Sequence, residues 1–526
     1  MKTLSTSVLI ALAISLWQCS GHSASPSSSS ESSDTIDSIS QVVSKELTLP
    51  DTSFPSVERI KYTISIVDTS DAALASTANL YAQVDGALTF RKGPQRDADF
   101  GGHLDSVPSA FEVDWTFRTH EDYTPTKFGA WGGGTGWTGQ PLYIQWPESY
   151  VKQFKQSLLM NDDCSGREIM VGSLAAKVYF IDFETGKASR TPIDVTNPIK
   201  GTISLDPTLN GNLYVGHGVP AHGEMGAMVI DLFKARRTHF FGPDPKAQRN
   251  WGAYDSSPIR VGQFLFRPGE NGSIYKFVVS QGQLRLHTVL RYTAGGSAPG
   301  IEASMSVYGN YGFTADNAGN ILCINLNTMH PVWHYKLPDD VDSTPVICVE
   351  DDGKAYLYTG CEVEHPGVTE AVFVKLDALT GREVWTNHIP AQRANVGSKH
   401  FDGGYYSTAL PGSGDCKDLI LVNVVHNTSG MNGSFSAIER ATGKTRYTTP
   451  LRYYAWSSPV GFMGPDNKMY IVTADCSGRL YLIRGIDGKI ITTSVVGANF
   501  ESSPVVVGNS IVVGSRGNSI YRVTIK

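Results

Sequence analysis

The chain has 526 residues, of which 18% are charged, 10% are aromatic and 53 are glycine, and its formal net charge is −6. This composition is typical of many short strands joined by tight turns, and long stretches with helical hydrophobic spacing are almost absent, which predicts an all-β protein. A small negative charge over this length gives no electrostatic field suited to nucleic acid, so that class of partner is excluded.

Residues 1–19 predict export. An apolar run from Val8 to Trp17 is too short to span a membrane and is followed by Cys19. The run is similar to a bacterial lipobox, although Trp17 and Gln18 replace the small residues usual there. We therefore predict a signal peptide with lipidation of Cys19, and simple secretion is the alternative. The expected location is periplasmic or anchored to the outer membrane, and the lipid anchor is the only membrane association expected.

Residues 20–35, SGHSASPSSSSESSDT, are too polar to bury anything, so we expect a solvated tether. Residues 36–84 contain the strand-like runs KYTISIVDTS and STANLYAQV, which predict a small appendage packed on the main body formed by residues 85–526. Six cysteines follow Cys19, and neither C-x-x-C nor the haem attachment pattern C-x-x-C-H occurs. We expect buried thiols with one bridge at most, and we assign no metal site.

Near copies of one pattern recur along residues 85–526. ESSPVVVGNSIVVGSRGNSIYRVTIK at the end of the chain matches YDSSPIRVGQFLFRPGENGSIYKFVV, 246 residues earlier. Each copy has a start, usually two small residues and a proline, followed by two strands and a third that begins with Ile-Tyr in the clearest copies. Self-similarity at a period of about 52 residues predicts a propeller or a solenoid. The eight starts are Pro141, Leu205, Pro258, Met305, Pro345, Ala409, Pro459 and Pro504.

The third strand of several units runs into a Thr-Gly-Lys or Asp-Gly-Lys turn and a fourth strand, and glycine supplies the positive φ of such hairpins. Four antiparallel strands make one propeller blade. The last unit ends on its third strand, whereas residues 109–119, SAFEVDWTFRT, look like a fourth strand. We therefore predict an eight-bladed β-propeller of four-stranded antiparallel blades, closed by residues 111–117 pairing with the last blade. Seven blades with an accessory sheet is the alternative.

One segment has helical spacing. ESYVKQFKQSLLMNDD, after Pro147, places Val151, Phe154, Leu158 and Leu159 on one face, which predicts a short packing helix inserted in the first blade.

The units resemble the quinoprotein-type β-propeller repeat. LDALTGREVW, residues 376–385, is similar to that family's A-x-D-x-x-T-G-x-x-x-W tryptophan-docking signature. Other units are degenerate, since Trp333 keeps the aromatic residue without Thr-Gly, and residues 181–187 and 438–444 keep Thr-Gly-Lys without the tryptophan. The resemblance covers residues 85–526 and implies the fold, which carries enzymes, ligand binders and scaffolds alike.

The loops that lead into the innermost strands of a propeller, here called leading loops, lie on one face. The hairpins between second and third strands, here called middle hairpins, reach the same face and bring His217, His222, Glu224, Glu364, His365 and His426 there. Carboxylates and aromatic rings converging on one face predict a binding site. The candidate ligand-binding residues are Trp131, Trp137, Trp251, Tyr254, Asp255, Glu302, Asp342, Asp402, Tyr406, Trp456 and Glu501.

Each type of residue also has a structural interpretation. The tryptophans and tyrosines suit blade packing, the carboxylates before Ser-Ser or Ser-Thr suit turn capping, and His217, His222 and Glu224 suit a solvated loop. An open channel mouth would favour a small ligand, and a plugged one would favour partners at the surface. We assign no catalytic residue.

Three functions remain open. We favour a non-catalytic binding or scaffold module of the bacterial cell envelope, similar to the propeller lipoprotein of the outer-membrane barrel-assembly machinery, with envelope proteins as partners. A carbohydrate-binding propeller is an alternative, because tryptophan faces and carboxylates suit glycans. The resemblance also implies a dehydrogenase with pyrroloquinoline quinone and calcium, but the adjacent cysteine pair common in such enzymes is missing, so we expect no cofactor.

Overall fold

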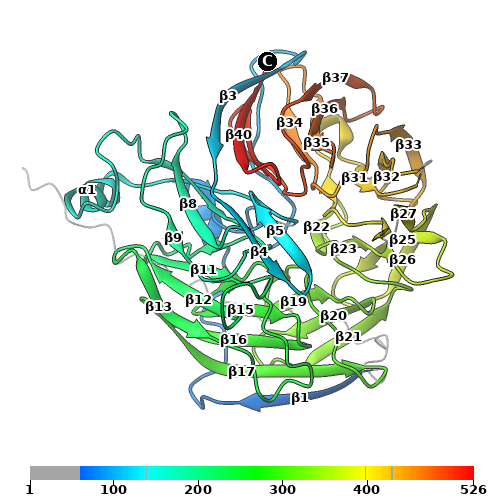
Figure 1. The fold of residues 1–526 in the computed structure, drawn as a ribbon. Coiled ribbons are helices and arrows are strands. Elements are labelled where there is room, and N and C mark those ends of the chain that lie inside the picture. Colours follow the sequence, from blue (N-terminus) through cyan, green and yellow to red (C-terminus); the bar gives the residue numbers. More distant parts are fainter. Residues whose placement is uncertain (1–59, 138, 397–398, 428–429) are drawn as a thin grey trace, which may run out of the picture. The chain divides into compact units, whose positions relative to one another are not determined.

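The fold is an eight-bladed β-propeller, seen in a computed structural model of the chain (Figure 1). The structure describes residues 60–526 except 138, 397–398 and 428–429. Eight antiparallel sheets of four or five strands follow one another around a ring. The all-β class and the eight blades are therefore confirmed, and the alternative of seven blades is wrong. The signal peptide, the lipidation of Cys19 and the tether, predicted for residues 1–35, lie outside the described residues.

The blades are numbered in chain order, and the strands of each are given in their order of pairing from the innermost strand outward. Blade 1 consists of β2 (Gly86–Ala87), β6 (Leu142–Gln145), β7 (Arg167–Gly172), β8 (Lys177–Asp182) and β9 (Ile193–Asp194). Blade 2 consists of β10 (Ser204–Leu205), β11 (Asn212–Gly216), β12 (Ala227–Asp231) and β13 (Arg236–Phe241). Blade 3 consists of β14 (Ile259–Val261), β15 (Phe264–Gly269), β16 (Ser273–Ser280), β17 (Gln283–Ala294) and β1 (Ile60–Ile66). Blade 4 consists of β18 (Ser306–Tyr308), β19 (Tyr311–Ala315), β20 (Asn320–Asn325) and β21 (Pro331–Lys336).

The second half of the ring follows the same plan. Blade 5 consists of β22 (Val346–Val349), β23 (Ala355–Gly360), β25 (Glu370–Asp377) and β26 (Glu383–Pro390). Blade 6 consists of β30 (Leu410–Pro411), β31 (Leu419–Val424), β32 (Ser434–Glu439) and β33 (Thr445–Pro450). Blade 7 consists of β34 (Val460–Met463), β35 (Met469–Ala474), β36 (Arg479–Arg484) and β37 (Ile490–Val495). Blade 8 consists of β38 (Val505–Val507), β39 (Ser510–Ser515), β40 (Ser519–Ile525) and β3 (Phe111–Arg118).

The predicted repeat starts coincide with the inner strands. Leu205 lies within β10, and the other seven positions directly precede β6, β14, β18, β22, β30, β34 and β38. Loops outside the blade sheets carry short paired strands of their own. In loops between blades, β4 (Glu121–Thr126) pairs with β5 (Gly129–Gly133), and β27 (Ala394–Val396) pairs with β28 (Lys399–Phe401). In addition, β24 (Glu362–Val363), within the hairpin between β23 and β25 of blade 5, pairs with β29 (Gly403–Gly404), which precedes blade 6.

The ring is closed by β3, as predicted. This strand pairs antiparallel with β40 from Phe111 opposite Ile525 to Arg118 opposite Ser519, with a bulge between Val113 and Trp115. Blade 8 therefore contains strands from both ends of the propeller, and β3 covers the edge that β40 would otherwise leave open.

Tryptophan side chains join neighbouring blades. The indole N–H of Trp115 in blade 8 donates to the carbonyl of Phe183 in blade 1 at 2.9 Å, and that of Trp333 in blade 4 donates to the carbonyl of Ala378 in blade 5 at 3.0 Å. The Trp333 ring lies on Gly381, where an added Cβ would be 2.6 Å from a ring atom. Glycine is therefore required at this turn by the ring of the preceding blade as well as by its positive φ.

Residues 88–103 fill the centre of the ring, a feature that was not predicted. The side chains of Arg91 and Arg96 are fully buried there. Their guanidinium groups donate, at 2.7–3.1 Å, to backbone carbonyls next to the innermost strands of blades 3, 4, 6 and 7: Ser257, Met305, Ala409 and Pro459. Burial lowers the pKa of Arg91 to about 9. The channel is thus plugged by a segment of the chain itself, which we call the plug.

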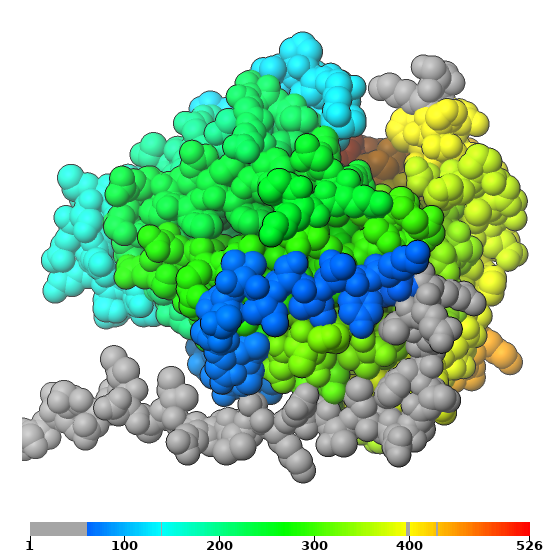
Figure 2. Space-filling model, turned by 90° about the horizontal axis from the view of Figure 1, so that it is seen from below, coloured from blue at the N-terminus to red at the C-terminus, as the bar shows by residue number. Residues whose placement is uncertain are grey.

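One further segment, β1, lies on the outside of the ring. β1 pairs with β17 along its whole length, from Ile60 opposite Ala294 to Ile66 opposite Thr288, and Figure 2 shows this blue band along the green strands of blade 3. The second strand-like run of this region instead contains a short 3-10 helix, η2 (Leu80–Gln83). A second such turn, η3 (Gly414–Cys416), precedes β31.

The predicted helix is α1 (Glu148–Gln156). Its Phe154 is buried, stacks on Phe233 at 5.4 Å and meets Trp146 edge to face at 5.1 Å, so the helix packs on blades 1 and 2. Leu158 lies beyond the helix and is 90% exposed, so its expected place on the packing face is wrong. Within the described ranges no helix is long and apolar enough to cross a membrane. All six described cysteines are buried free thiols.

Candidate functional site

Leading loops and middle hairpins bring carboxylates together on one face of the ring, which we call the mouth. Asp255 and Glu302 come from the leading loops of blades 3 and 4, and Glu270 comes from the middle hairpin between β15 and β16. Each offers a carboxylate oxygen within 4.8 Å of the other two. Burial raises the pKa of Glu270 well above its usual value, and the carboxylates of Glu302 and Asp255 raise it further.

One lysine lies against this first triad. The Nζ atom of Lys200, from the leading loop of blade 2, is 2.5 Å from Oδ2 of Asp255 and 3.2 Å from Oε2 of Glu302. It also lies 5.2 Å from the centroid of the Trp137 ring. Burial alone would lower the pKa of Lys200, but Asp255 and Glu302 outweigh it and raise that pKa well above the usual value. Lys200 therefore stays charged and compensates one of the three carboxylates.

A second triad lies beside the first and has no such partner. Asp340 and Asp342 come from the leading loop of blade 5, and Glu362 comes from β24 in the middle hairpin of the same blade. Among the described residues, no lysine, arginine or histidine forms an ion pair with any of the three. Burial raises the pKa of all three carboxyls, and repulsion from neighbouring carboxylates of the two triads adds to the effect.

The two triads form one electrostatic unit, since Glu302 of the first also raises the pKa of Asp342 in the second. Together with Lys200 they make up what we call the acidic mouth cluster. The described part of the chain thus sets six carboxylates against one ammonium group in a largely buried place. A concentration of like charge at this depth is costly unless protons or a cation neutralise it.

Three aromatic side chains border the acidic mouth cluster. Tyr406 and Trp456 stack with ring centroids 5.0 Å apart and an interplanar angle of 22°, and Trp137 lies 6.0 Å and 6.2 Å from them. The Tyr406 hydroxyl hydrogen-bonds to the Glu362 carboxyl. The leading loops of blades 1, 6 and 7 therefore place the predicted rings together, with Tyr406 bonded to Glu362 and Trp137 near Lys200.

The remaining predicted residues lie in other surroundings. Tyr254 is a packing residue, with its ring 6.2 Å from Phe241 and 6.0 Å from Tyr275. Asp402 forms an ion pair with Arg393 at 2.5 Å. Glu501 pairs with Arg516 at 3.1 Å, and this guanidinium group lies 5.6 Å from the ring centroid of Trp131. Trp251 does reach the acidic mouth cluster, because its indole N–H donates to Oε2 of Glu270 at 2.9 Å.

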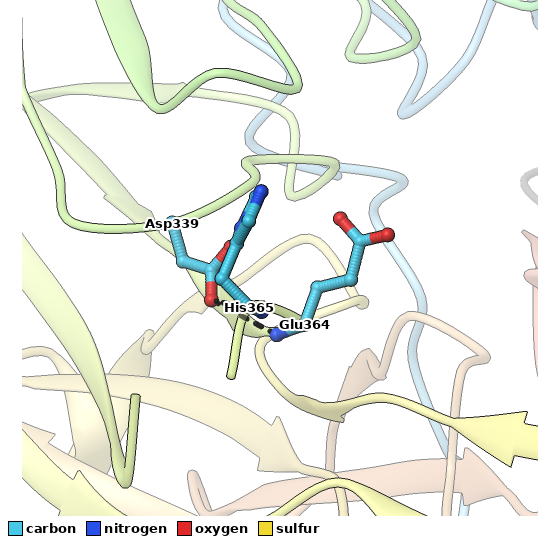
Figure 3. Close-up of side chains that lie close together, drawn as sticks. All are labelled: Asp339, Glu364 and His365. Carbon is cyan, nitrogen blue, oxygen red and sulfur yellow. Dashed lines mark hydrogen bonds and ion pairs between the residues drawn. The ribbon is translucent and has the colours of Figure 1, made fainter. Parts of the chain in front are cut away.

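Asp339, Glu364 and His365 form a third group of possible metal ligands, shown in Figure 3, but their arrangement is that of a capped turn. The buried Asp339 accepts the backbone N–H groups of Glu364 at 2.9 Å and His365 at 3.0 Å, and it pairs with the His365 ring. Burial alone would raise the pKa of Asp339, but the hydrogen bond from His365 and these backbone bonds lower it. This carboxylate already has its partners and holds the blade 5 insertion in place.

The histidines of the blade 2 insertion were expected in a solvated loop. His217 is instead fully buried, with Nε2 2.5 Å from the carbonyl of Val195, and burial lowers its pKa to about 4. His222 is on the surface and pairs with Asp122 of β4 at 2.5 Å. The solvated-loop interpretation is therefore wrong for His217, which acts as a core residue.

Sequence reasoning missed four members of the acidic mouth cluster: Lys200, Glu270, Asp340 and Glu362. All four lie in leading loops or middle hairpins, the two sets of loops that were expected to converge. The signal that could have identified them is a charged residue at any position of these loops. The prediction used only matching positions of the leading loops and the three longest middle hairpins, and in the CEVEHPGVTE insertion it named Glu364 but not Glu362.

Comparison of the sequence with protein-family models and with curated proteins gave no match. Solved structures do share the fold. Quinohemoprotein alcohol dehydrogenase from Comamonas testosteroni is 11% identical, with a TM-score of 0.58 over 84% of this chain and 80% of that one. A europium-containing methanol dehydrogenase is 12% identical, with a TM-score of 0.56 over 85% of this chain and 100% of that one. The resemblance to quinoprotein-type propellers is thereby confirmed for the fold.

BamB from Moraxella catarrhalis is also similar, at 13% identity over 79% of this chain and 100% of that one. Its TM-score of 0.48 is too low to support an argument about function.

Proposed function

We propose that this chain is a non-catalytic binding module of the bacterial cell envelope, exported by its N-terminal signal, and that it binds a multivalent cation at the mouth. One observation carries the cation proposal: six carboxylates lie together with a single lysine as their cationic partner among the described residues. Carboxylate oxygens are the ligands that Ca²⁺ and similar hard cations prefer. The triad of Asp340, Asp342 and Glu362, with which Lys200 forms no ion pair, is the favoured site.

The physical state of the chain without a cation supports this choice. Carboxyls with raised pKa values keep their protons to a higher pH than exposed carboxyls do, and a divalent or trivalent ion can replace those protons. A structure with the same fold contains europium, which supports a multivalent ion as the class of ligand.

The residues of the mouth do not fit a flat quinone between the aromatic rings. A ring inserted between two others needs a separation of roughly 7 Å, twice the contact distance of carbon atoms. Tyr406 and Trp456 stack at 5.0 Å, so they already occupy each other's faces. We derive no redox step for this chain.

A larger partner would bind on the surface of the ring. Residues 88–103 fill its centre, so the channel offers no passage for an extended ligand. Envelope proteins or glycans are the partners proposed for the outer face.

The cation proposal is tested by titrating purified protein with Ca²⁺ and with Tb³⁺ in a calorimeter after treatment with a chelator. We expect saturable binding that Asp342→Asn and Glu362→Gln each weaken by about tenfold or more, since each removes one charged ligand. Glu370→Gln, at a half-exposed carboxylate of the same blade, is the matched control and should bind as the unmodified protein does. Absence of binding, or equal binding by all variants, would show the proposal to be wrong.

A further inference from the structure

A hairpin that is not part of any blade crosses the mouth. β4 and β5, cyan in Figure 1, lie in front of the middle of the ring. The base of the hairpin is fixed to blade 8, where the side-chain amide of Asn518 donates to Oε1 of Glu121 at 2.8 Å and the N–H of Thr135 donates to the carbonyl of Ser515 at 3.2 Å. The hairpin therefore starts at one side of the mouth.

The hairpin makes its other contacts with blades 2 and 3. Asp122 pairs with His222 of the blade 2 insertion at 2.5 Å. At the tip, the Phe128 ring meets the Trp251 ring edge to face at 5.6 Å, and the Nζ atom of Lys127 lies 5.2 Å from the centroid of the same indole. Trp251 belongs to the leading loop of blade 3, so the tip is docked across the mouth from its base.

Trp251 also contacts the acidic mouth cluster. Its indole N–H donates to Oε2 of Glu270 at 2.9 Å, while Oε1 of this 95% buried carboxylate has no hydrogen-bond partner among the described residues. The indole thus binds one oxygen of Glu270, and this carboxyl also lies against Asp255 and Glu302. One side chain connects the tip of the hairpin to a carboxylate of the cluster.

We propose that the β4–β5 hairpin is a lid over the acidic mouth cluster and that Trp251 is the positioning residue that links lid docking to cation binding. This inference rests on the proposed function. The docked tip holds the indole in place, and the indole holds Glu270 with Oε1 directed to the cation. Because linkage is reciprocal, a bound cation stabilises the docked lid to the same extent that the lid stabilises the bound cation.

The test uses the whole protein loaded with Tb³⁺, whose release to excess chelator is followed by stopped-flow luminescence. Phe128→Ala removes the contact of the lid tip but keeps the indole N–H, and Trp251→Phe keeps a ring at the contact but removes the N–H. We expect each to raise the release rate about tenfold, the change expected for loss of one hydrogen bond to a charged group. The double variant should release no faster than about the faster single variant, because both changes break one connection.

Tyr123→Ala is the matched control. It removes a 62% exposed ring from the same hairpin, and it should release Tb³⁺ at the unmodified rate. Since Phe128 is 52% exposed, Phe128→Ala is expected to fold, and equal melting temperatures would verify this. Release of Tb³⁺ from Phe128→Ala at the unmodified rate, or additive effects in the double variant, would show the lid proposal to be wrong. Neither result would contradict the proposal that the mouth binds a cation. If the unmodified protein bound no Tb³⁺, the proposed function and the lid would both fail.

Discussion

The indole N–H of Trp385 in blade 5 donates to the carbonyl oxygen of Arg440 in blade 6 at 2.8 Å, and the Trp385 ring covers Gly443 of the same turn. Trp115 and Trp333 make the same contact with the blades that follow them. The tryptophan at the end of the repeat signature and the Thr-Gly turn of the next repeat are therefore two halves of one joint between blades.

This joint predicts that two glycine-to-alanine substitutions will lower the free energy of unfolding by different amounts. Gly443 and Gly353 both have positive φ, +71° and +76°, but a Cβ at Gly443 would lie 2.6 Å from the Trp385 ring, whereas one at Gly353 would meet nothing within 4 Å. Gly353→Ala should reduce the free energy of unfolding by about 1–2 kcal/mol, the backbone cost alone. Gly443→Ala should cost about 1–3 kcal/mol more because the ring must move. Urea unfolding of both variants measures the difference, and equal losses would contradict the joint.

Removing Lys200 should destabilise the cation-free protein. Lys200→Met leaves Asp255 and Glu302 without their cationic partner, and breaking a buried ion pair in this way costs about 3–5 kcal/mol. Added Ca²⁺ should restore part of the loss, because a ligand that binds only the folded state stabilises it. Lys187→Met, at an exposed pair with Asp163 whose atoms are 3.8 Å apart, should change stability little. Thermal unfolding in chelator and in Ca²⁺ provides the comparison, and an unchanged melting temperature for Lys200→Met would count against the cluster.

The plug should contribute strongly to stability. Arg91→Met removes the donors to the buried carbonyls of Ala409 and Pro459, and each unsatisfied carbonyl costs about 1–3 kcal/mol. Arg452→Met, at an exposed position on the ring, is the control and should stay within about 0.5 kcal/mol of the unmodified protein. Chemical unfolding measures both, and a similar small effect for the two would show that the plug is not held by its arginine.

Stability should also depend on pH through the acidic mouth cluster. Burial and mutual repulsion raise the folded pKa values of Asp340, Asp342 and Glu362 well above their usual 3.8 and 4.5. Below about pH 4 these carboxyls are protonated in both the folded and the unfolded protein. Their contribution to the free energy of unfolding is then lost as pH rises through the raised pKa values of the folded protein. The melting temperature in chelator should therefore fall as pH rises above about 4, and more steeply than for Glu362→Gln. Ca²⁺ should oppose the fall at the upper end, whereas parallel curves for both proteins would exclude the effect.

Most of the fold could be predicted from the sequence because propeller blades repeat. The recurring pattern located the inner strands of each blade, and the missing fourth strand of the last unit pointed to residues 111–117. The plug could not be predicted, because residues 88–103 have no internal repeat. Their conformation depends on carbonyls as far along the chain as Pro459, which no local pattern reveals.

The candidate site could be predicted only in part. Asp255, Glu302 and Asp342 occupy equivalent positions of successive leading loops, so the repeat itself identified them. Glu270 and Glu362 lie in middle hairpins of different lengths, where no shared position exists. Which carboxylate turns inward there depends on pairing such as that of β24 with β29, a contact between distant segments.

The position of the plug also constrains the order of assembly. Arg91 is among the earliest residues of the propeller, yet its hydrogen-bond partner Pro459 follows 368 residues later. A nascent chain therefore carries two arginines whose acceptors on the blades do not yet exist, and the innermost part of the molecule is completed only when the last blades are made. Such distant partners slow folding, since the entropy of closing long loops is lost before the contacts form. We expect the blades to assemble around the plug. A chain that ends before blade 7 would therefore lack part of the interior of the ring.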